Sequence, residues 1–180
     1  MKFRPLALAA LLALVAASAQ AKLESGAPAP DFSIPAALGG KDFRFSMAEA
    51  LKKGPVVLYF YPKSFTKVCT DEAHEFAEAM AEFKSLGASV IGVSGDSIET
   101  QREFSSLECR DAFPVGADPE FRVIKAYDAS GMGGLYASRI SYVVSPQGRI
   151  LSSVADSGAV RHIQAALETV RAWRRAGAKG

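Results

Sequence analysis

The chain has 180 residues, and its 21 lysine and arginine residues nearly balance its 19 aspartate and glutamate residues. A chain of this length forms one ordinary domain with a substantial core. Two of the basic residues, Lys2 and Arg4, lie in an N-terminal leader that has no acidic residue. The remainder is therefore close to neutral, which argues against a nucleic-acid or membrane-surface partner.

The first residues have the pattern of a secretory signal peptide. Two positive charges precede an apolar run at residues 6–17, and Ala19-Gln20-Ala21 fits a small-x-small cleavage site. The apolar run is shorter than the roughly 20 residues that span a bilayer. We therefore predict cleavage after Ala21, export to the periplasm and a single domain over residues 22–180.

The first part of this domain is predicted to be mostly extended. Residues 22–35 are rich in turn-forming residues, and Gly39-Gly40 predicts a hairpin turn before an extended segment at residues 42–45. A short helix is expected over residues 47–52. Residues 56–60 are apolar on both faces and rich in β-branched and aromatic residues, which predicts a central strand covered by helices on both sides.

A long helix is predicted next. Apolar residues repeat with helical spacing over residues 69–86, and Gly87 follows at the usual C-terminal position. A second apolar strand at residues 89–93 completes a strand–helix–strand unit with a parallel pair of strands. Ser97 can then cap another helix that runs to about residue 107.

The next segment has short elements. Residues 113–117 are predicted to be extended, and Asp118-Pro119 supplies an N-cap and first residue for a helix over residues 120–127. The glycines of residues 131–134 predict a flexible loop.

The end of the chain predicts a hairpin and a final helix. Residues 140–144 and 149–154 flank a Ser-Pro-Gln-Gly turn. The last helix is expected over residues 159–175. Its apolar stripe consists of Val160, Ile163, Leu167 and Val170. This order of elements predicts an α/β fold, and periodicity alone goes no further.

The segment that leads into the long helix carries the chemistry. Pro62, Thr66 and Cys69 follow one another at spacings of four and three residues. A thiol at a helix N-terminus lies in the positive field of the helix dipole, which favours its anion. The Thr66 hydroxyl and the free amides of Val68 and Cys69 can donate to negative charge that develops on a group reacting with the thiol, and Pro62 can wall the pocket.

The Pro-x-x-x-Thr-x-x-Cys spacing resembles the active-site signature of the peroxiredoxins. The runs Tyr59-Phe60-Tyr61-Pro62 and Cys69-Thr70-Asp71-Glu72-Ala73 are similar to the PrxQ or bacterioferritin-comigratory-protein type. The resemblance covers residue 26 to the last helix. It implies a thioredoxin-like fold, with a central mixed sheet flanked by helices and an N-terminal β-hairpin extension. It also implies a thiol-dependent peroxidase that reduces hydrogen peroxide and organic hydroperoxides through Cys69.

The resemblance further implies an arginine beside the thiol, at the start of a later strand. Arg139 opens the run Arg139-Ile140-Ser141-Tyr142-Val143-Val144, which is similar to the family pattern. Arginine stays charged and offers a planar fork of donors. Glu72 could pair with Arg139 and hold its orientation.

Cys69 and Cys109 are the two cysteines of the chain. Many members of the family have a resolving cysteine five residues after the peroxidatic one, where this chain has His74. Others resolve from the following helix, so the resemblance implies that Cys109 forms an intramolecular disulfide with oxidised Cys69. A thioredoxin-like protein or a small thiol would then reduce this disulfide.

Several alternatives stay open. The pair could be a structural disulfide, and the protein could be a one-cysteine peroxiredoxin, an exported redox sensor or a thioredoxin-like oxidoreductase, although it lacks Cys-x-x-Cys. Monomer and homodimer are both possible. The scattered cysteines and histidines lack the spacing of a zinc site, and we expect no metal or cofactor. His74 and His162 are expected at the surface or half-buried, and Ser94-Gly95-Asp96 is expected to carry no chemistry.

Overall fold

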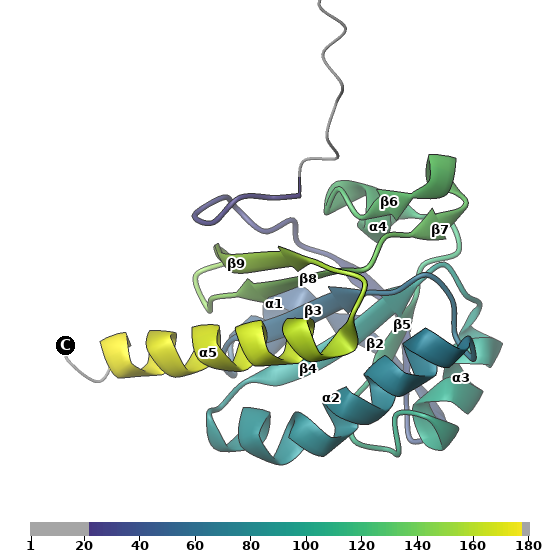
Figure 1. The fold of residues 1–180 in the computed structure, drawn as a ribbon, viewed down its shortest axis with the longest axis horizontal. Helices are drawn as coiled ribbons and strands as arrows, with labels where there is room; N and C mark the ends of the chain where they lie inside the picture. The colour runs from purple at the N-terminus through teal and green to yellow at the C-terminus, as the bar shows by residue number, and fades with distance from the viewer. Residues whose placement is uncertain (1–21, 178–180) are drawn as a thin grey trace, which may run out of the picture.

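The computed structural model describes residues 22–177, so the predicted signal peptide lies outside the described residues. Figure 1 shows the helices and strands of this part of the chain. They are β1 (Ser33–Leu38), β2 (Lys41–Ser46), α1 (Met47–Leu51), β3 (Val56–Phe60), α2 (Lys67–Ser85), β4 (Ser89–Ser94), α3 (Ile98–Leu107), β5 (Val115–Ala117), α4 (Arg122–Ala126), β6 (Ser130–Gly131), η1 (Met132–Gly134), β7 (Tyr136–Ala137), β8 (Ile140–Val144), β9 (Ile150–Ala155) and α5 (Ala159–Gly177). Over these residues, every helix is too short or too polar to cross a membrane.

Seven strands form one mixed sheet in the order β2-β1-β5-β4-β3-β8-β9. Its centre is parallel because β4 pairs in parallel with both β3 and β5. Strand β8 joins β3 in antiparallel register, and β9 pairs with β8 as the predicted hairpin. The β1–β2 hairpin joins the other side through β5. The predicted α/β architecture, a mixed sheet with an N-terminal hairpin, is confirmed.

Each face of the sheet carries its own hydrophobic cluster. On one face α2 and α5 pack against each other over the sheet (Figure 1) and bury side chains such as Phe76 and Leu167. On the other face α1 and α4 contribute Met47 and Ile124. All five residues of β3 are buried, as predicted for a strand covered on both sides.

Helix α2 begins at Lys67, two residues before the predicted start, which places Cys69 in its first turn. The predicted apolar stripe is buried against the sheet along the helix. Its buried apolar residues after the first turn are Ala73, Phe76, Met80 and Phe83. The helix stops before Gly87, whose φ of 74° is the left-handed conformation that glycine adopts without strain.

The apolar stripe predicted for α5 is wrong at one residue, which is exposed in the structure. Val160 is 51% exposed, while Ile163, Leu167 and Val170 are buried together with His162 and Ala166. At about 100° per residue, Val160 lies about a quarter turn from the centre of this buried face. The buried face therefore includes a histidine in place of a valine.

Two predicted boundaries in the middle of the chain also differ. Helix α4 starts at Arg122 because Phe121 has a φ of 57°, which is not helical. Asp118 still satisfies the start of the helix, since its carboxylate accepts the amides of Arg122 and Ile124 at 3.0 and 2.9 Å. Of the loop predicted at residues 131–134, Gly131 ends β6, and residues 132–134 form the short turn η1, in which Gly133 has a non-helical φ of 66°.

Candidate active site

Cys69 lies where the loop after β3 turns into α2. Its side chain is 2% exposed, so the thiol is shielded from bulk water. The first amide that bonds within the helix is that of Thr70, which donates to the carbonyl of Thr66 at 2.9 Å. The amides of Val68 and Cys69 precede it, where the helix itself supplies no acceptor. The sulfur therefore lies at the positive end of α2.

Sheet pairing brings Arg139 to Cys69 across 70 positions of sequence. Arg139 directly precedes β8, and β8 pairs with β3 so that Ile140 lies opposite Phe60. The residue before β8 therefore faces the start of the loop that follows β3. Arg139 Nη2 donates to Cys69 Sγ at 3.3 Å, and Arg139 Nη1 donates to Glu72 Oε2. The structure contains the predicted pairing of Arg139 with Glu72.

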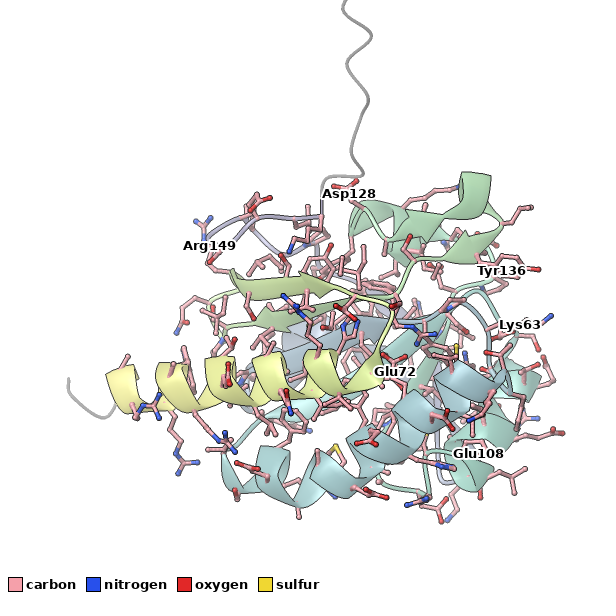
Figure 2. All side chains as sticks on the ribbon, in the orientation of Figure 1. Lys63, Glu72, Glu108, Asp128, Tyr136 and Arg149 are labelled. Carbon is pink, nitrogen blue, oxygen red and sulfur yellow. The ribbon has the colours of Figure 1, made fainter. Side chains whose placement is uncertain are left out.

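Glu72 lies one helical turn after Cys69 and is fully buried. Figure 2 shows it on the side of α2 that faces α5. Burial raises the pKa of Glu72 to about 7, and the guanidinium of Arg139 opposes this shift. A buried carboxylate without a partner would be strongly disfavoured, so the anion depends on Arg139.

The Thr66 hydroxyl is engaged differently from the prediction. It donates to the carbonyl of Lys63 at 2.9 Å, and the side chain is exposed. A threonine hydroxyl has one proton to donate, so this bond competes with donation to the sulfur or to a peroxide. Thr66 occupies the N-cap position of α2, but among the described residues its side chain makes no capping bond.

Pro62 is half-buried in the loop that leads into α2, and its predicted role as a wall of the thiol pocket stays a prediction. It lines a hollow of about 170 Å³ together with Phe121, Leu135 and Tyr136. Lys63 also lines this hollow, and Figure 2 shows Lys63 and Tyr136 at the same end of the molecule. The hollow adjoins the active-site loop and has a mixed lining, because Asp96 and Lys63 contribute charged groups beside the aromatic rings.

Cys109 follows α3 and is fully buried. It and Cys69 are free thiols and belong to the same hydrophobic cluster. Burial raises the pKa of Cys109 far above its ordinary value, and the neighbouring Glu108 adds to the shift. Cys109 is therefore a neutral thiol while α3 is packed in place.

The two histidines differ in environment. His74 is half-buried, as expected, and its Nε2 lies 2.8 Å from Glu108 Oε2. His162 is buried, which corrects the expectation for it: Nδ1 lies 2.8 Å from Ser141 Oγ and Nε2 lies 3.0 Å from the carbonyl oxygen of Asp156. Burial lowers the pKa of His162. The Ser141 partner has no local signal in the sequence because β8 and α5 meet only in the fold.

Sequence reasoning also missed a polar cluster behind the active-site loop. Asp96 Oδ2 accepts the amide of Ser64 at 2.7 Å, so the Ser94-Gly95-Asp96 segment does have a structural part in the site. Gln101 of α3 is buried and accepts the hydroxyl of Tyr61 at 2.7 Å. A polar residue at a position where helical periodicity predicts burial was the one available signal for Gln101. Periodicity does not identify the hydrogen-bond partners that such a residue needs.

A buried thiol at a helix start, contacted by an arginine from a neighbouring strand, defines a thiol-based redox enzyme on a mixed α/β sheet. Comparison with known proteins agrees. The model of the AhpC/TSA family matches residues 25–153. The chain therefore belongs to this family, and it is a thiol-dependent peroxidase of the peroxiredoxin class with a thioredoxin-like fold.

Individual relatives are of the Bcp type. A bcp-type sequence of Helicobacter pylori strain J99 is 34% identical over 155 residues, which cover 83% of this chain and 99% of the relative. Peroxiredoxin Bcp of Xanthomonas campestris is 28% identical over 81% of this chain and 92% of its own length. The crystal structure of peroxidoxin BcpB from Mycobacterium tuberculosis has a TM-score of 0.76 at 28% identity, and the match covers 83% of this chain and 97% of that one.

Proposed function

We propose that this peroxidase reduces hydrogen peroxide and organic hydroperoxides through Cys69, and that Cys109 resolves the oxidised cysteine. The observation that carries the proposal is the 3.3 Å contact between Arg139 Nη2 and Cys69 Sγ, with Glu72 holding the other guanidinium nitrogen. A fixed positive charge at this position stabilises the thiolate. It also stabilises the negative charge that develops as the O–O bond breaks.

In the first step the Cys69 thiolate attacks the terminal oxygen of the hydroperoxide. An S–O bond forms as the O–O bond breaks, which leaves a sulfenic acid on Cys69. The departing alkoxide or hydroxide takes a proton and leaves as an alcohol or water.

In the second step the Cys109 sulfur attacks the sulfenic sulfur of Cys69. An S–S bond forms, and the sulfenic hydroxyl leaves with the Cys109 proton as water. An external dithiol or two small thiols then supply two electrons and two protons that restore both cysteines. Because Cys109 is buried after α3, this step requires local opening of α3 and of the first turn of α2. The absence of a side-chain cap from Thr66 lowers the cost of opening that turn.

Peroxide consumption with a thiol reductant tests the first step. Cys69→Ser should abolish consumption, and full activity in that variant would refute the assignment of Cys69. Repeated turnover distinguishes an enzyme from a redox sensor, which would be oxidised once and then stop.

Mass spectrometry after a stoichiometric peroxide pulse tests the second step. We expect a Cys69–Cys109 disulfide in the wild-type protein and a sulfenic acid in Cys109→Ser. A persistent sulfenic acid in the wild type, with Cys109 still free, would indicate a one-cysteine mechanism instead.

We also propose that the protein is exported and works with a thiol reductant outside the cytoplasm. The leader pattern of residues 1–21 supports this. N-terminal sequencing of the protein from a periplasmic fraction should give Lys22 as the first residue. Retention of Met1 on the exported protein would contradict the predicted cleavage.

A further inference from the structure

A buried side-chain amide connects the active-site loop to α3. Gln101 is fully buried in α3, and its Oε1 accepts the hydroxyl of Tyr61 at 2.7 Å. Ser64 Oγ, also buried, lies 3.3 Å from the same oxygen. On its other side Gln101 Nε2 donates to Ser94 Oγ at 2.7 Å and to the carbonyl oxygen of Gly116 at 3.3 Å. One side chain therefore joins the loop after β3, the end of β4 and strand β5.

The orientation of this amide is fixed by its surroundings. The carbonyl oxygen of Gly116 can only accept, so it must face the nitrogen of Gln101. Ser94 Oγ then accepts from Gln101 and donates to Asp96 Oδ2 at 2.7 Å, and Asp96 Oδ2 also accepts the amide of Ser64. Both ends of the Gln101 amide have partners, and a buried network satisfied in this way holds a single conformation.

The hydrogen-bond network connects the segment that precedes Cys69 with the helix that precedes Cys109. Its loop side, Tyr61 and Ser64, lies in the segment that leads into Cys69. Its helix side, Gln101, is eight residues before Cys109 in the helix and turn that must move for the disulfide to form. Aromatic contacts connect the same two segments. Phe104 of α3 stacks with Tyr61 at a ring-centroid distance of 5.6 Å and contacts Phe65 edge-on at a ring-centroid distance of 5.2 Å. Phe65 has a φ of 62°, a conformation that a non-glycine residue keeps only when its surroundings hold it.

We propose that Gln101 is a positioning residue that couples the active-site loop to the docking of α3, and so favours the peroxide step and restrains the disulfide step. The second half rests on the proposed role of Cys109. While α3 is docked, Gln101 fixes Tyr61 and Ser64, and with them the loop that sets Cys69 against Arg139. When α3 moves away from the sheet, the hydrogen bonds of Gln101 to Tyr61 and Ser64 break. The active-site loop then becomes mobile at the stage where Cys69 must approach Cys109.

This coupling predicts opposite effects on the two steps. Replacing Gln101 with methionine keeps the length and burial of the side chain but removes all four contacts. Without these contacts the loop positions Cys69 less accurately against Arg139. Sulfenic acid formation should therefore slow by about tenfold to about a hundredfold. Helix α3 is at the same time less firmly docked, so disulfide formation becomes faster. A substitution that only destabilised the fold would not separate the two rates in this way.

The test measures the two steps separately. Sulfenic acid formation is followed in a Cys109→Ser parent by dimedone trapping and mass spectrometry, with and without Gln101→Met. Disulfide formation is followed with Cys109 intact, after one equivalent of hydrogen peroxide. Glu103→Met is the matched control, because it places the same side chain at an exposed position of α3. Tyr61→Phe removes the hydroxyl that contacts Gln101 and Ser64 but keeps the other Gln101 contacts, and it should shift both rates in the same directions as Gln101→Met, by less.

The outcomes are distinguishable. Slower sulfenic acid formation with faster disulfide formation in Gln101→Met, and neither change in Glu103→Met, would support the proposal. Equal rates in Gln101→Met and the control, or a fall in both rates, would overturn it. If Gln101→Met does not fold, Tyr61→Phe decides by the same criteria. A Cys109→Ser parent that forms no sulfenic acid would instead refute the proposed peroxidase mechanism.

Discussion

At the scale of single residues, Arg139 is the centre of the site because it lies between two groups that carry negative charge in the reactive state. One of its terminal nitrogens contacts Cys69 Sγ and the other contacts Glu72. A lysine has one charged nitrogen and cannot hold both contacts in a fixed plane. The planar fork of the arginine side chain, and not only its charge, is what this geometry uses.

Arg139→Lys should therefore slow sulfenic acid formation by roughly a hundredfold, the usual cost of losing one donor to a developing negative charge. The second-order rate constant with hydrogen peroxide, measured by competition with a reporter peroxidase, checks this. Arg149→Lys is a suitable control because Arg149 is an exposed arginine in the turn between β8 and β9. A near wild-type rate in Arg139→Lys would show that charge alone is sufficient.

Glu72 predicts a pH dependence of stability. Its pKa in the fold, about 7, lies above the ordinary value of 4.5, so folding favours the protonated carboxyl. The stability that it contributes is present below about pH 4.5 and is lost as the pH rises through about 7. The free energy of unfolding of the wild type should therefore fall over this range relative to Glu72→Gln, which does not titrate.

Urea unfolding of the two proteins at a series of pH values measures this difference. The comparison isolates Glu72, because His162 and the other titrating groups are present in both proteins. A difference that stays constant between about pH 4.5 and about pH 8 would contradict the raised pKa of Glu72.

At the scale of elements, two polar side-chain pairs hold α2 against the segment that follows α3. His74 pairs with Glu108 at 2.8 Å, and Glu78 pairs with Arg110 at 3.3 Å. These pairs flank Cys109 on both sides in the sequence. They oppose the movement that the proposed disulfide step requires of Cys109, although pairs that are partly exposed contribute little individually.

Removing both pairs with His74→Gln and Glu78→Gln should speed disulfide formation by about twofold to about fivefold, the factor that one exposed pair or two can supply. The rate is measured after a single peroxide pulse, with sulfenic acid formation unchanged. Arg122→Ala, which removes the exposed pair with Glu120 at the start of α4, serves as the control. An unaltered rate in the double variant would mean that the two pairs do not restrain α3.

The main elements could be predicted from the sequence because each has a local signal. The stripe of α2 and the left-handed Gly87 follow from short-range geometry, and so does the fully buried β3. The start of α2 was harder to predict, since Lys67 and Val68 are helical in the structure but carry no apolar periodicity. Val160 was misplaced because it lies about a quarter turn around α5 from the centre of the face that the sheet covers.

At the scale of the whole molecule, packing across the sheet limits what each position tolerates. Gly92 of β4 lies opposite Tyr59 of β3, and a Cβ at Gly92 would lie 2.6 Å from Tyr59 Cζ. The ring cannot move away easily because it is fully buried and stacked on Phe76 at 4.3 Å. Gly92 therefore makes room for an aromatic stack that supports the helix carrying Cys69.

Gly92→Ala should lower the free energy of unfolding by about 1–3 kcal/mol, the usual cost of overpacking a core. Gly87→Ala is an informative comparison: a Cβ there meets no atom within 4 Å, so it carries only the strain of a positive φ, about 1 kcal/mol. Urea unfolding measures both variants. A Gly92→Ala protein as stable as the wild type would show that the Tyr59 ring can shift.

The sequence by itself determined the α/β class, the elements that surround Cys69 and the position of that thiol at the start of a helix. These features depend on side-chain periodicity, turn residues and spacing within a few tens of residues. Family resemblance added Arg139 and Cys109 as candidates, but not their contacts. The tertiary structure decided that Arg139 reaches the sulfur, that His162 is buried, that Thr66 turns to Lys63 and that Gln101 joins the loop to α3. These contacts follow from the order and register of the strands, which bring together residues whose separation along the chain carries no local signal.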